Sequence, residues 1–429
     1  MDNLLGNQMR EVRRASGLRF VDFVQTIGYS ASYVRNVEGG SRAVTAELAD
    51  AYDRVLATGG RFRDALASKE SEPWDQAGNI AAIVQLLDRN DVELDRRSIV
   101  AAAGVALGGA AVRWVSALRA VRSAESGSTS RQVGKAVIDN VDQRLGLLRH
   151  LDDELGSGEH AVIARNELAF VVQLLKTGSY SQRSGERLYS LASEASRQAA
   201  WSSFDQGKHG AALAYFDGAL RASANARDGV AGAYALSFFA VHCYSTGQAR
   251  AAVDMIDTAQ SALSGSATPR MSAMLAARSA RAQSKAGERT ACIRDLAAAR
   301  VHLDRGPHQD DPAVLYWVTE AEIEMIAGSC ALELGDSGEA LRRFEAALAA
   351  DYRGDDQYPR SAAIYLARAA EAHLAQHDLE AAVFRARQAV RCLESVDSAR
   401  SSSTLAGLRT KLASHTASPV VGTFLEEYA

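Results

Sequence analysis

Four residues near the N-terminus have side chains of the types that can enter a nucleic-acid groove. They lie within GYSASYVRNVEGGSR (28–42), where Arg35 can pair with guanine and Asn36 with adenine. Ala31 and Ser32 stand four residues earlier, and their small side chains let a helix approach the bases closely. At about 100° per residue the four side chains share one side of a helix, a pattern typical of base reading in the major groove.

The flanking residues predict how this helix is held. Ser30 is a good N-cap for a helix over 31–38, and Gly28-Tyr29 breaks the chain before it. The apolar residues on its opposite side and on the preceding helical run are Phe23, Val24, Ile27, Tyr33, Val34 and Val37. We therefore expect two short helices that are joined by a tight turn and packed through these residues.

Residues 4–56 resemble the helix-turn-helix of the phage-repressor-like, or XRE, family of transcription regulators. The resemblance rests on MREVRRASGL (9–18), the Gly28 turn, and Ser30, Tyr33, Val34, Val37, Glu38, Gly40 and Arg42. It implies that the helix 31–38 lies in the major groove of DNA. The residues that the resemblance assigns to DNA binding are Arg19, Ser30, Ala31, Ser32, Arg35, Asn36, Ser41 and Arg42, the last two near phosphate.

One position departs from the pattern of that family. The second helix usually opens with Ser or Thr followed by Gln, and these residues contact the DNA backbone, whereas this chain has Arg19 and Phe20. Arg19 can contact a phosphate, but Phe20 cannot.

The charge of the chain sets a further condition on DNA binding. The 429 residues carry a formal net charge of −4, so attraction to nucleic acid must be local. Residues 1–69 hold ten Lys or Arg and eight Asp or Glu, and one such domain binds DNA weakly because affinity depends on phosphate neutralisation. We therefore expect a homodimer whose two copies read two half-sites of an operator.

A helical repeat fills the chain from about residue 131 onward. Its turn residues recur 40, 40, 48 and 42 positions apart, at Gly207, Gly247, Gly287, Gly335 and His377. Small residues stand seven positions before each turn and five and twelve after it, and a larger apolar residue stands nine after most of them. Small residues at such offsets let two antiparallel helices pack closely. The pattern resembles tetratricopeptide helix pairs, although its spacing exceeds their usual length of about 34 residues.

These patterns predict an all-α protein in three parts. Residues 1–67 form the helix-turn-helix bundle, 68–130 a helical linker, and 131–429 an α-solenoid of tetratricopeptide-like helix pairs. In the linker, Arg96-Arg97 and the apolar run 98–112 look like a twin-arginine export signal. The run is internal and shorter than the about 20 residues of a membrane span, so we expect a buried linker helix in a cytoplasmic protein.

The repeat register also predicts a ligand-binding wall. Stacked helix pairs form a concave surface lined by the first helix of each pair. The side chains that the register places there and that suit an effector are Arg165, Glu194, Arg197, Trp201, Tyr234, Ser237, Tyr244, Arg281, Glu322 and Ser329. Aromatic rings supply contact area and arginines hold carboxylates, so an extended peptide or a small molecule is one interpretation. Ordinary packing between repeats is the other.

The chain offers no catalytic or metal-binding pattern. His373 and His377 stand one helical turn apart in HLAQH, but the Glu that a zinc peptidase needs is replaced by Leu374. The four cysteines lie far apart, so we expect buried thiols in place of a disulfide or zinc site. The sequence predicts no enzyme, no metal and no cofactor.

The order of the three parts resembles actinobacterial transcription regulators with tetratricopeptide repeats. In domain order alone it is similar to the peptide-pheromone-responsive regulators of Gram-positive bacteria. The resemblance implies a dimeric, operator-binding regulator whose repeat domain binds an effector, with a short peptide as one candidate. The alternative is a scaffold or sequestering protein that binds a protein partner through its repeats and has a degenerate helix-turn-helix.

Overall fold

The computed structural model describes residues 4–39, 44–65, 132–155, 157–350, 358–394 and 398–428, together with 110, 111, 113–115 and 118. Within these residues the regular structure is helical, apart from one isolated bridge between Gln132 and Ser179. The predicted all-α fold is therefore confirmed. None of the described helices combines the length and the hydrophobicity that crossing a membrane requires.

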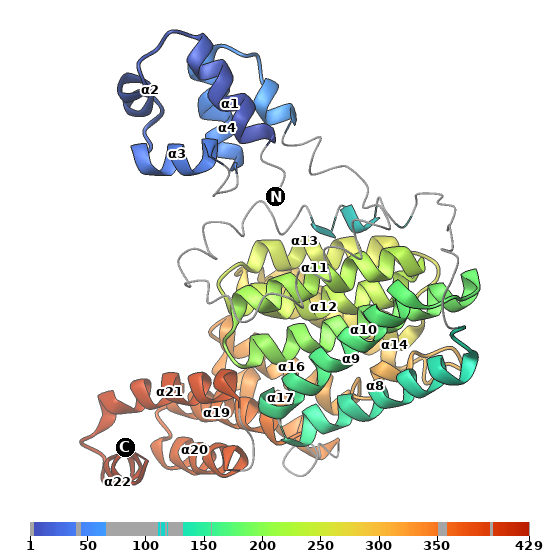
Figure 1. The fold of residues 1–429 in the computed structure, drawn as a ribbon. Coiled ribbons are helices and arrows are strands. Elements are labelled where there is room, and N and C mark those ends of the chain that lie inside the picture. Colours follow the sequence, from blue (N-terminus) through green and yellow to red (C-terminus); the bar gives the residue numbers. More distant parts are fainter. Residues whose placement is uncertain are drawn as a thin grey trace.

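The N-terminal unit is a small bundle around one apolar core (Figure 1). Its helices are α1 (Leu4–Ala15), α2 (Phe20–Ile27), α3 (Ala31–Glu38) and α4 (Ala46–Leu56). Val34 and Val37 of α3 are buried against Phe23 of α2, as the sequence predicts, because the 3.6-residue period brings them to one side of the helix. Tyr33 is only half-buried, and its ring stacks on that of Tyr29.

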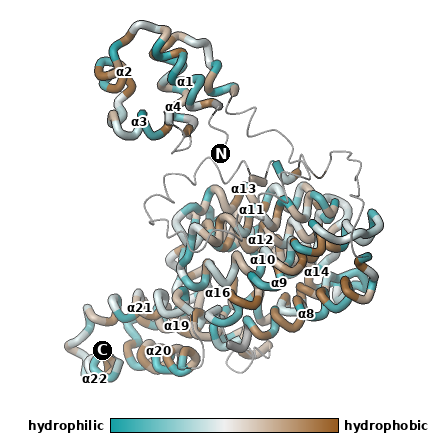
Figure 2. Tube along the Cα trace, in the orientation of Figure 1, coloured by the Kyte–Doolittle hydropathy of each residue, from teal (hydrophilic) through white to brown (hydrophobic). Residues whose placement is uncertain are grey.

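The C-terminal region consists of consecutive helix pairs. Its helices are α8 (Lys135–Leu155), α9 (Ser157–Thr177), α10 (Gln182–Asp205), α11 (His209–Ala226), α12 (Gly229–Ser245), α13 (Ala249–Ala262), α14 (Pro269–Lys285), α15 (Arg289–Leu303), α16 (Glu320–Glu333), α17 (Ser337–Ala349), α19 (Pro359–Ala375), α20 (Leu379–Leu393), α21 (Ala399–Leu412) and α22 (Pro419–Glu427). Figure 2 shows hydrophobic and hydrophilic stretches alternating along these helices, which is the pattern of helices packed on one side. Residues 313–315 and 413–415 form short 3₁₀ turns, η1 and η2.

The repeat register predicted from the sequence matches the backbone. All five turn residues have positive φ, from 61° at His377 to 88° at Gly247, so each occupies the left-handed region that favours glycine. The small residues at the other offsets are buried within the pairs. At Gly328 a Cβ atom would lie 2.6 Å from the ring of Phe344, which shows why that position must be small. The register therefore describes true close approaches between helices.

The first and last parts of the repeat region contact each other, which the register does not predict. The guanidinium of Arg360 at the start of α19 donates hydrogen bonds of 2.9 Å to both carboxylate oxygens of Asp152 on α8. Asp205 at the end of α10 is fully buried and accepts hydrogen bonds from Ser398 and Arg400, next to α21 and within it. These ion pairs join residues about two hundred positions apart.

The end of the predicted linker packs on the repeat region. Trp114 is fully buried, and its indole Nε1 donates a 2.9 Å hydrogen bond to the hydroxyl of Ser223. Ala110 and Ala111 are buried in the same core. The remainder of the linker, including 68–75, Arg96-Arg97 and the apolar run up to residue 109, lies outside the described residues.

Candidate nucleic-acid interface and repeat-region cavities

Helix α3 begins and presents its side chains as the sequence predicts. The hydroxyl of Ser30 accepts a 3.2 Å hydrogen bond from the backbone N–H of Tyr33, which satisfies one of the free donors at the helix start. Ser32, Arg35 and Asn36 are exposed on the side opposite the core, while Ala31 is half-buried. The described part of the N-terminal unit thus presents a hydroxyl, a guanidinium and an amide together.

A buried ion pair holds the end of α3. Glu38 accepts hydrogen bonds from Arg13 of α1, 2.6 Å from Nε to Oε1 and 2.7 Å from Nη2 to Oε2. The hydroxyl of Tyr52 on α4 donates a third, 2.8 Å long, to Oε1. Because Glu38 binds both neighbouring helices, it fixes the rotation of α3 about its own axis. The sequence pattern contained Glu38, but its partners become visible only in the fold.

Phe20 lies beneath the exposed arginine. Its ring centroid is 4.9 Å from Cζ of Arg35 and 4.7 Å from Cζ of Arg13, so the ring lies against two guanidinium groups. Such cation–π contacts are worth about 0.5–1 kcal/mol at exposed sites. The residue that departs from the family pattern therefore orients Arg35, although it makes no polar contact itself.

The remaining predicted DNA contacts lie around α3. Arg19 precedes α2, is highly exposed, and forms a 2.7 Å ion pair with Asp22, also exposed. Ser41 and Arg42, which the resemblance places near phosphate, lie outside the described residues.

The predicted effector wall is divided in the structure. Four of its residues, Arg197, Trp201, Tyr234 and Glu322, line one cavity of about 460 Å³. We call it the arginine-rich cavity, and its other lining residues include Arg149, Asp152, His160, Gln198, Phe238, Arg278, Tyr316, Trp317, Tyr358 and Arg360. The sequence register missed the residues that come from α8, from the start of α19 and from the turns near η1, because they belong to distant parts of the chain.

Two further wall residues face a second cavity. Arg281 and Ser329 line a space of about 710 Å³ that is shared with Lys285, Glu333 and Arg368. Glu333 forms ion pairs with both Lys285, at 2.6 Å, and Arg281, at 3.4 Å. The charges of this second cavity are therefore paired in part within the protein.

The last four wall residues line none of these cavities. Glu194 accepts hydrogen bonds from Arg149 and Arg197, so it lies directly behind the arginine-rich cavity. Ser237 is fully buried, and its hydroxyl donates to the carbonyl of Tyr234 in the same helix. Tyr244 is buried, and Arg165 is half-buried on α9.

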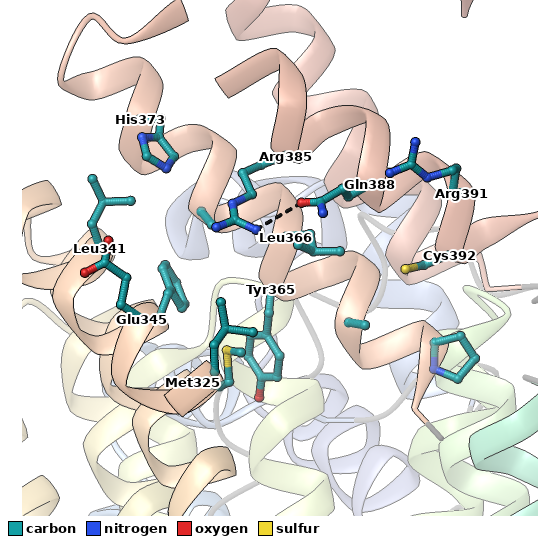
Figure 3. Close-up of a pocket in the computed structure, with 15 residues that line it drawn as sticks. Met325, Leu341, Glu345, Tyr365, Leu366, His373, Arg385, Gln388, Arg391 and Cys392 are labelled. Atoms are coloured by element: carbon teal, nitrogen blue, oxygen red, sulfur yellow. Dashed lines mark hydrogen bonds between the residues drawn. The ribbon is translucent and has the colours of Figure 1, made fainter. Parts of the chain in front are cut away.

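A third cavity, of about 430 Å³, is mainly apolar. It lies between α16, α17, α19 and α20 and is drawn in Figure 3, which shows Met325 and Tyr365 side by side at one end. At the opposite end Arg385 donates a 3.0 Å hydrogen bond to Gln388. None of the residues predicted to bind an effector lines this cavity, since its lining comes from second as well as first helices of the pairs.

Asp152 and Glu194, at the arginine-rich cavity, are ionised at neutral pH. Burial alone raises the pKa of Glu194, but the charge and hydrogen bonds of Arg197 outweigh it and lower the pKa to about 2. In the same way burial raises the pKa of Asp152, and Arg360 lowers it to about 2. Burial also lowers the pKa of His160, so its imidazole is neutral.

Comparison with known proteins bears on the N-terminal unit. Residues 4–66 match the family model of a helix-turn-helix domain, a range that covers α1 to α4. No curated protein is significantly similar to the chain. The protein therefore carries an N-terminal helix-turn-helix domain, typical of DNA-binding regulators, followed by an all-α region of consecutive helix pairs.

Proposed function

We propose that the protein is a sequence-specific transcription regulator whose helix α3 reads bases in the major groove. The observation that carries the proposal is the joint exposure of Ser32, Arg35 and Asn36 on α3 of a helix-turn-helix domain. The buried contacts of Glu38 support it, because a reading helix needs a fixed orientation on its scaffold. The protein acts by binding and is not an enzyme.

Two copies of the chain bind together. The N-terminal unit has a small excess of positive charge, so one copy neutralises few phosphates. In a symmetric dimer two α3 helices about 34 Å apart enter successive turns of the major groove and read an inverted repeat. The tetratricopeptide-like repeat region provides the dimer contact.

An effector bound in the repeat region controls operator binding. Any such ligand changes DNA affinity only through a difference in its own affinity for two dimer geometries. The packing of Trp114 against α11 and α12 supports this control, since it connects the end of the linker to the repeat region. A change in these helices therefore alters the anchor of the linker.

The test begins with selection of preferred sequences from a random DNA library by the purified full chain. Binding to the selected sequence and to scrambled DNA is then measured for wild type, Arg35→Ala and the control Arg183→Ala. Arg183 is an exposed arginine on α10, so its loss removes the same charge far from α3. Arg35→Ala should lose about 10- to 100-fold in discrimination at one base pair, whereas the control should lose none.

Two outcomes would overturn the proposal. Unchanged sequence preference in Arg35→Ala would reject α3 as the reader. Phosphate contacts impose a steep salt dependence, so the affinity of the wild type for duplex DNA should rise as the salt concentration is lowered. If it does not rise for any duplex, DNA binding itself is rejected. The second outcome would favour the scaffold alternative.

A further inference from the structure

We propose that the arginine-rich cavity binds a small aromatic carboxylate, whose carboxylate group pairs with Arg278. Only the role of this ligand as the effector rests on the proposed function. The binding site itself follows from the cavity and stands without DNA binding.

The size and lining of the cavity suit a small aromatic molecule. Its volume of about 460 Å³ lies within the range of about 300–1,000 Å³ typical of small-molecule sites. Most of its apolar lining residues are aromatic, including Trp201, Tyr234, Phe238 and Trp317. Trp317 is fixed in place, because its indole N–H donates a 3.2 Å hydrogen bond to the hydroxyl of Tyr234. Rings fixed in this way favour stacking with a planar ligand.

Arg278 is the arginine of the cavity that has no carboxylate partner within the described residues. Its Cζ lies 4.8 Å from the ring of Trp317 and 5.6 Å from the ring of Phe238. Its Nε is buried without a hydrogen-bond partner, and the side chain forms no ion pair with any described residue. Arg278 is half-buried, so its guanidinium is partly removed from water. Such a group costs free energy when it has no paired anion, and this position therefore favours a ligand that brings the anion.

The other arginines at the cavity already have partners. Arg149 and Arg197 both bind Glu194, at 3.0 and 2.9 Å, and Arg360 binds Asp152 at 2.9 Å. Four arginines line the cavity, and three carboxylates accompany them, Asp152 and Glu322 in the lining and Glu194 behind it. One positive charge is thus left for the ligand, which matches a carboxylate with a single negative charge better than a phosphate with two. A carboxylate also accepts two parallel hydrogen bonds from one guanidinium.

Further polar atoms at the same cavity provide a second contact. Oε1 of Gln198 and Nε of Arg149 are buried and make no hydrogen bond within the described structure. They suit a hydroxyl group of the ligand, which can donate to the first and accept from the second. The cavity therefore fits a hydroxylated aromatic acid.

The experiment uses the full chain and a panel of benzoate, 4-hydroxybenzoate, 1-naphthoate and indole-3-propionate, each beside its primary amide. Binding is measured by calorimetry and by tryptophan fluorescence, since Trp201 and Trp317 line the cavity. At least one acid should bind at least tenfold more tightly than its amide, because a hydrogen bond between two charged groups is stronger than one to a neutral amide.

The variants identify the residue responsible. Arg278→Gln should reduce binding of the acid to the level of its amide. The matched control, Arg270→Gln, lies on the same helix outside the cavity and should bind as wild type does. If Arg278→Gln does not fold, Arg278→Lys keeps the charge without the planar fork, and should bind the acid more weakly while still preferring it to the amide.

The proposal is overturned if no acid of the panel binds, if acid and amide bind equally, or if Arg278→Gln retains the preference. These results are independent of the DNA experiment, so failure of one proposal is distinguishable from failure of the other. An acid that binds through Arg278 and leaves operator affinity unchanged supports the site and rejects its role as effector.

Discussion

Replacing Glu38 by Gln should destabilise the helix-turn-helix domain strongly. The substitution keeps the size of the side chain and removes the charge that neutralises Arg13. Both side chains are buried, with 8% of Arg13 and 4% of Glu38 exposed. The amide can still accept a bond from Tyr52, but its NH₂ group cannot accept from the guanidinium. Arg13 is then a buried cation without an anion.

The burial of this pair sets the size of the effect. Removing one partner of a buried pair costs about 3–5 kcal/mol, because the other charge stays out of water. A 60-residue unit has a total stability of about 5 kcal/mol, so this loss takes up most of it. At about 1.4 kcal/mol per tenfold change, the unfolded fraction of the domain should rise by at least about 100-fold.

Hydrogen exchange of the full chain, followed by mass spectrometry of peptides from residues 4–65, measures this fraction directly. The control is Asp22→Asn. Arg19 and Asp22 form the same two-bond arrangement, at 2.7 and 3.0 Å, but their side chains are 84% and 46% exposed. Exposed pairs contribute about 0.2–1 kcal/mol, so the control should change protection by less than tenfold.

Equal effects of Glu38→Gln and Asp22→Asn would refute the reasoning, since the two pairs differ mainly in burial. A double-mutant cycle gives a second check. In Arg13→Gln/Glu38→Gln neither charge is left unpaired, so the double variant should lose less stability than the sum of the two single losses. Additive losses would show that the two side chains act independently.

Three further predictions concern the repeat region. The pKa of Asp152 is lowered to about 2 in the folded protein, so its ionised form contributes stability at pH values above its ordinary pKa of about 4. Urea unfolding should show about 2 kcal/mol of that stability lost as the pH falls from 5 to 2. Asp152→Asn should flatten this pH dependence. Gly232→Ala would place a Cβ atom 2.3 Å from the indole of Trp114, so it should lower the free energy of unfolding by about 1–3 kcal/mol and shift tryptophan emission to the red. The control Gly407→Ala, whose new Cβ has no heavy atom within 4 Å, should change neither. Cys243, Cys292 and Cys330 are buried and Cys392 is half-buried, so an aromatic disulfide reagent should label Cys392 first and the other three only as the chain unfolds.

Local patterns predicted the N-terminal domain and the helix pairs well. The bounds of α3, its Ser30 cap and its buried valines all follow from helical periodicity and capping within a few residues of one another. The turn residues of the repeats are likewise a local requirement, since each needs a positive φ. Phe20 shows where pattern matching is incomplete, because the residue that cannot bind phosphate proves to support Arg35.

Only part of the arginine-rich cavity could be predicted from the sequence, and the reason is physical. The repeat register places residues relative to the neighbouring pair, and this was enough to bring Arg197, Trp201 and Tyr234 to one surface. It carries no information on how small rotations between pairs add up along the solenoid. The meeting of α8 with α19, and the positions of Asp152 and Arg360, depend on that sum.

The ion pair between Asp152 and Arg360 has consequences for the cavity that an apolar contact would not have. A buried ion pair adds little net stability, because desolvation offsets most of the attraction, but its two parallel hydrogen bonds tolerate only a narrow range of geometries. The same two residues line the arginine-rich cavity. The contact that joins distant ends of the repeat region therefore also fixes the width of the cavity and occupies the charge of Arg360. Because Arg360 is paired with Asp152, the guanidinium of Arg278 is the group that selects ligands by their charge.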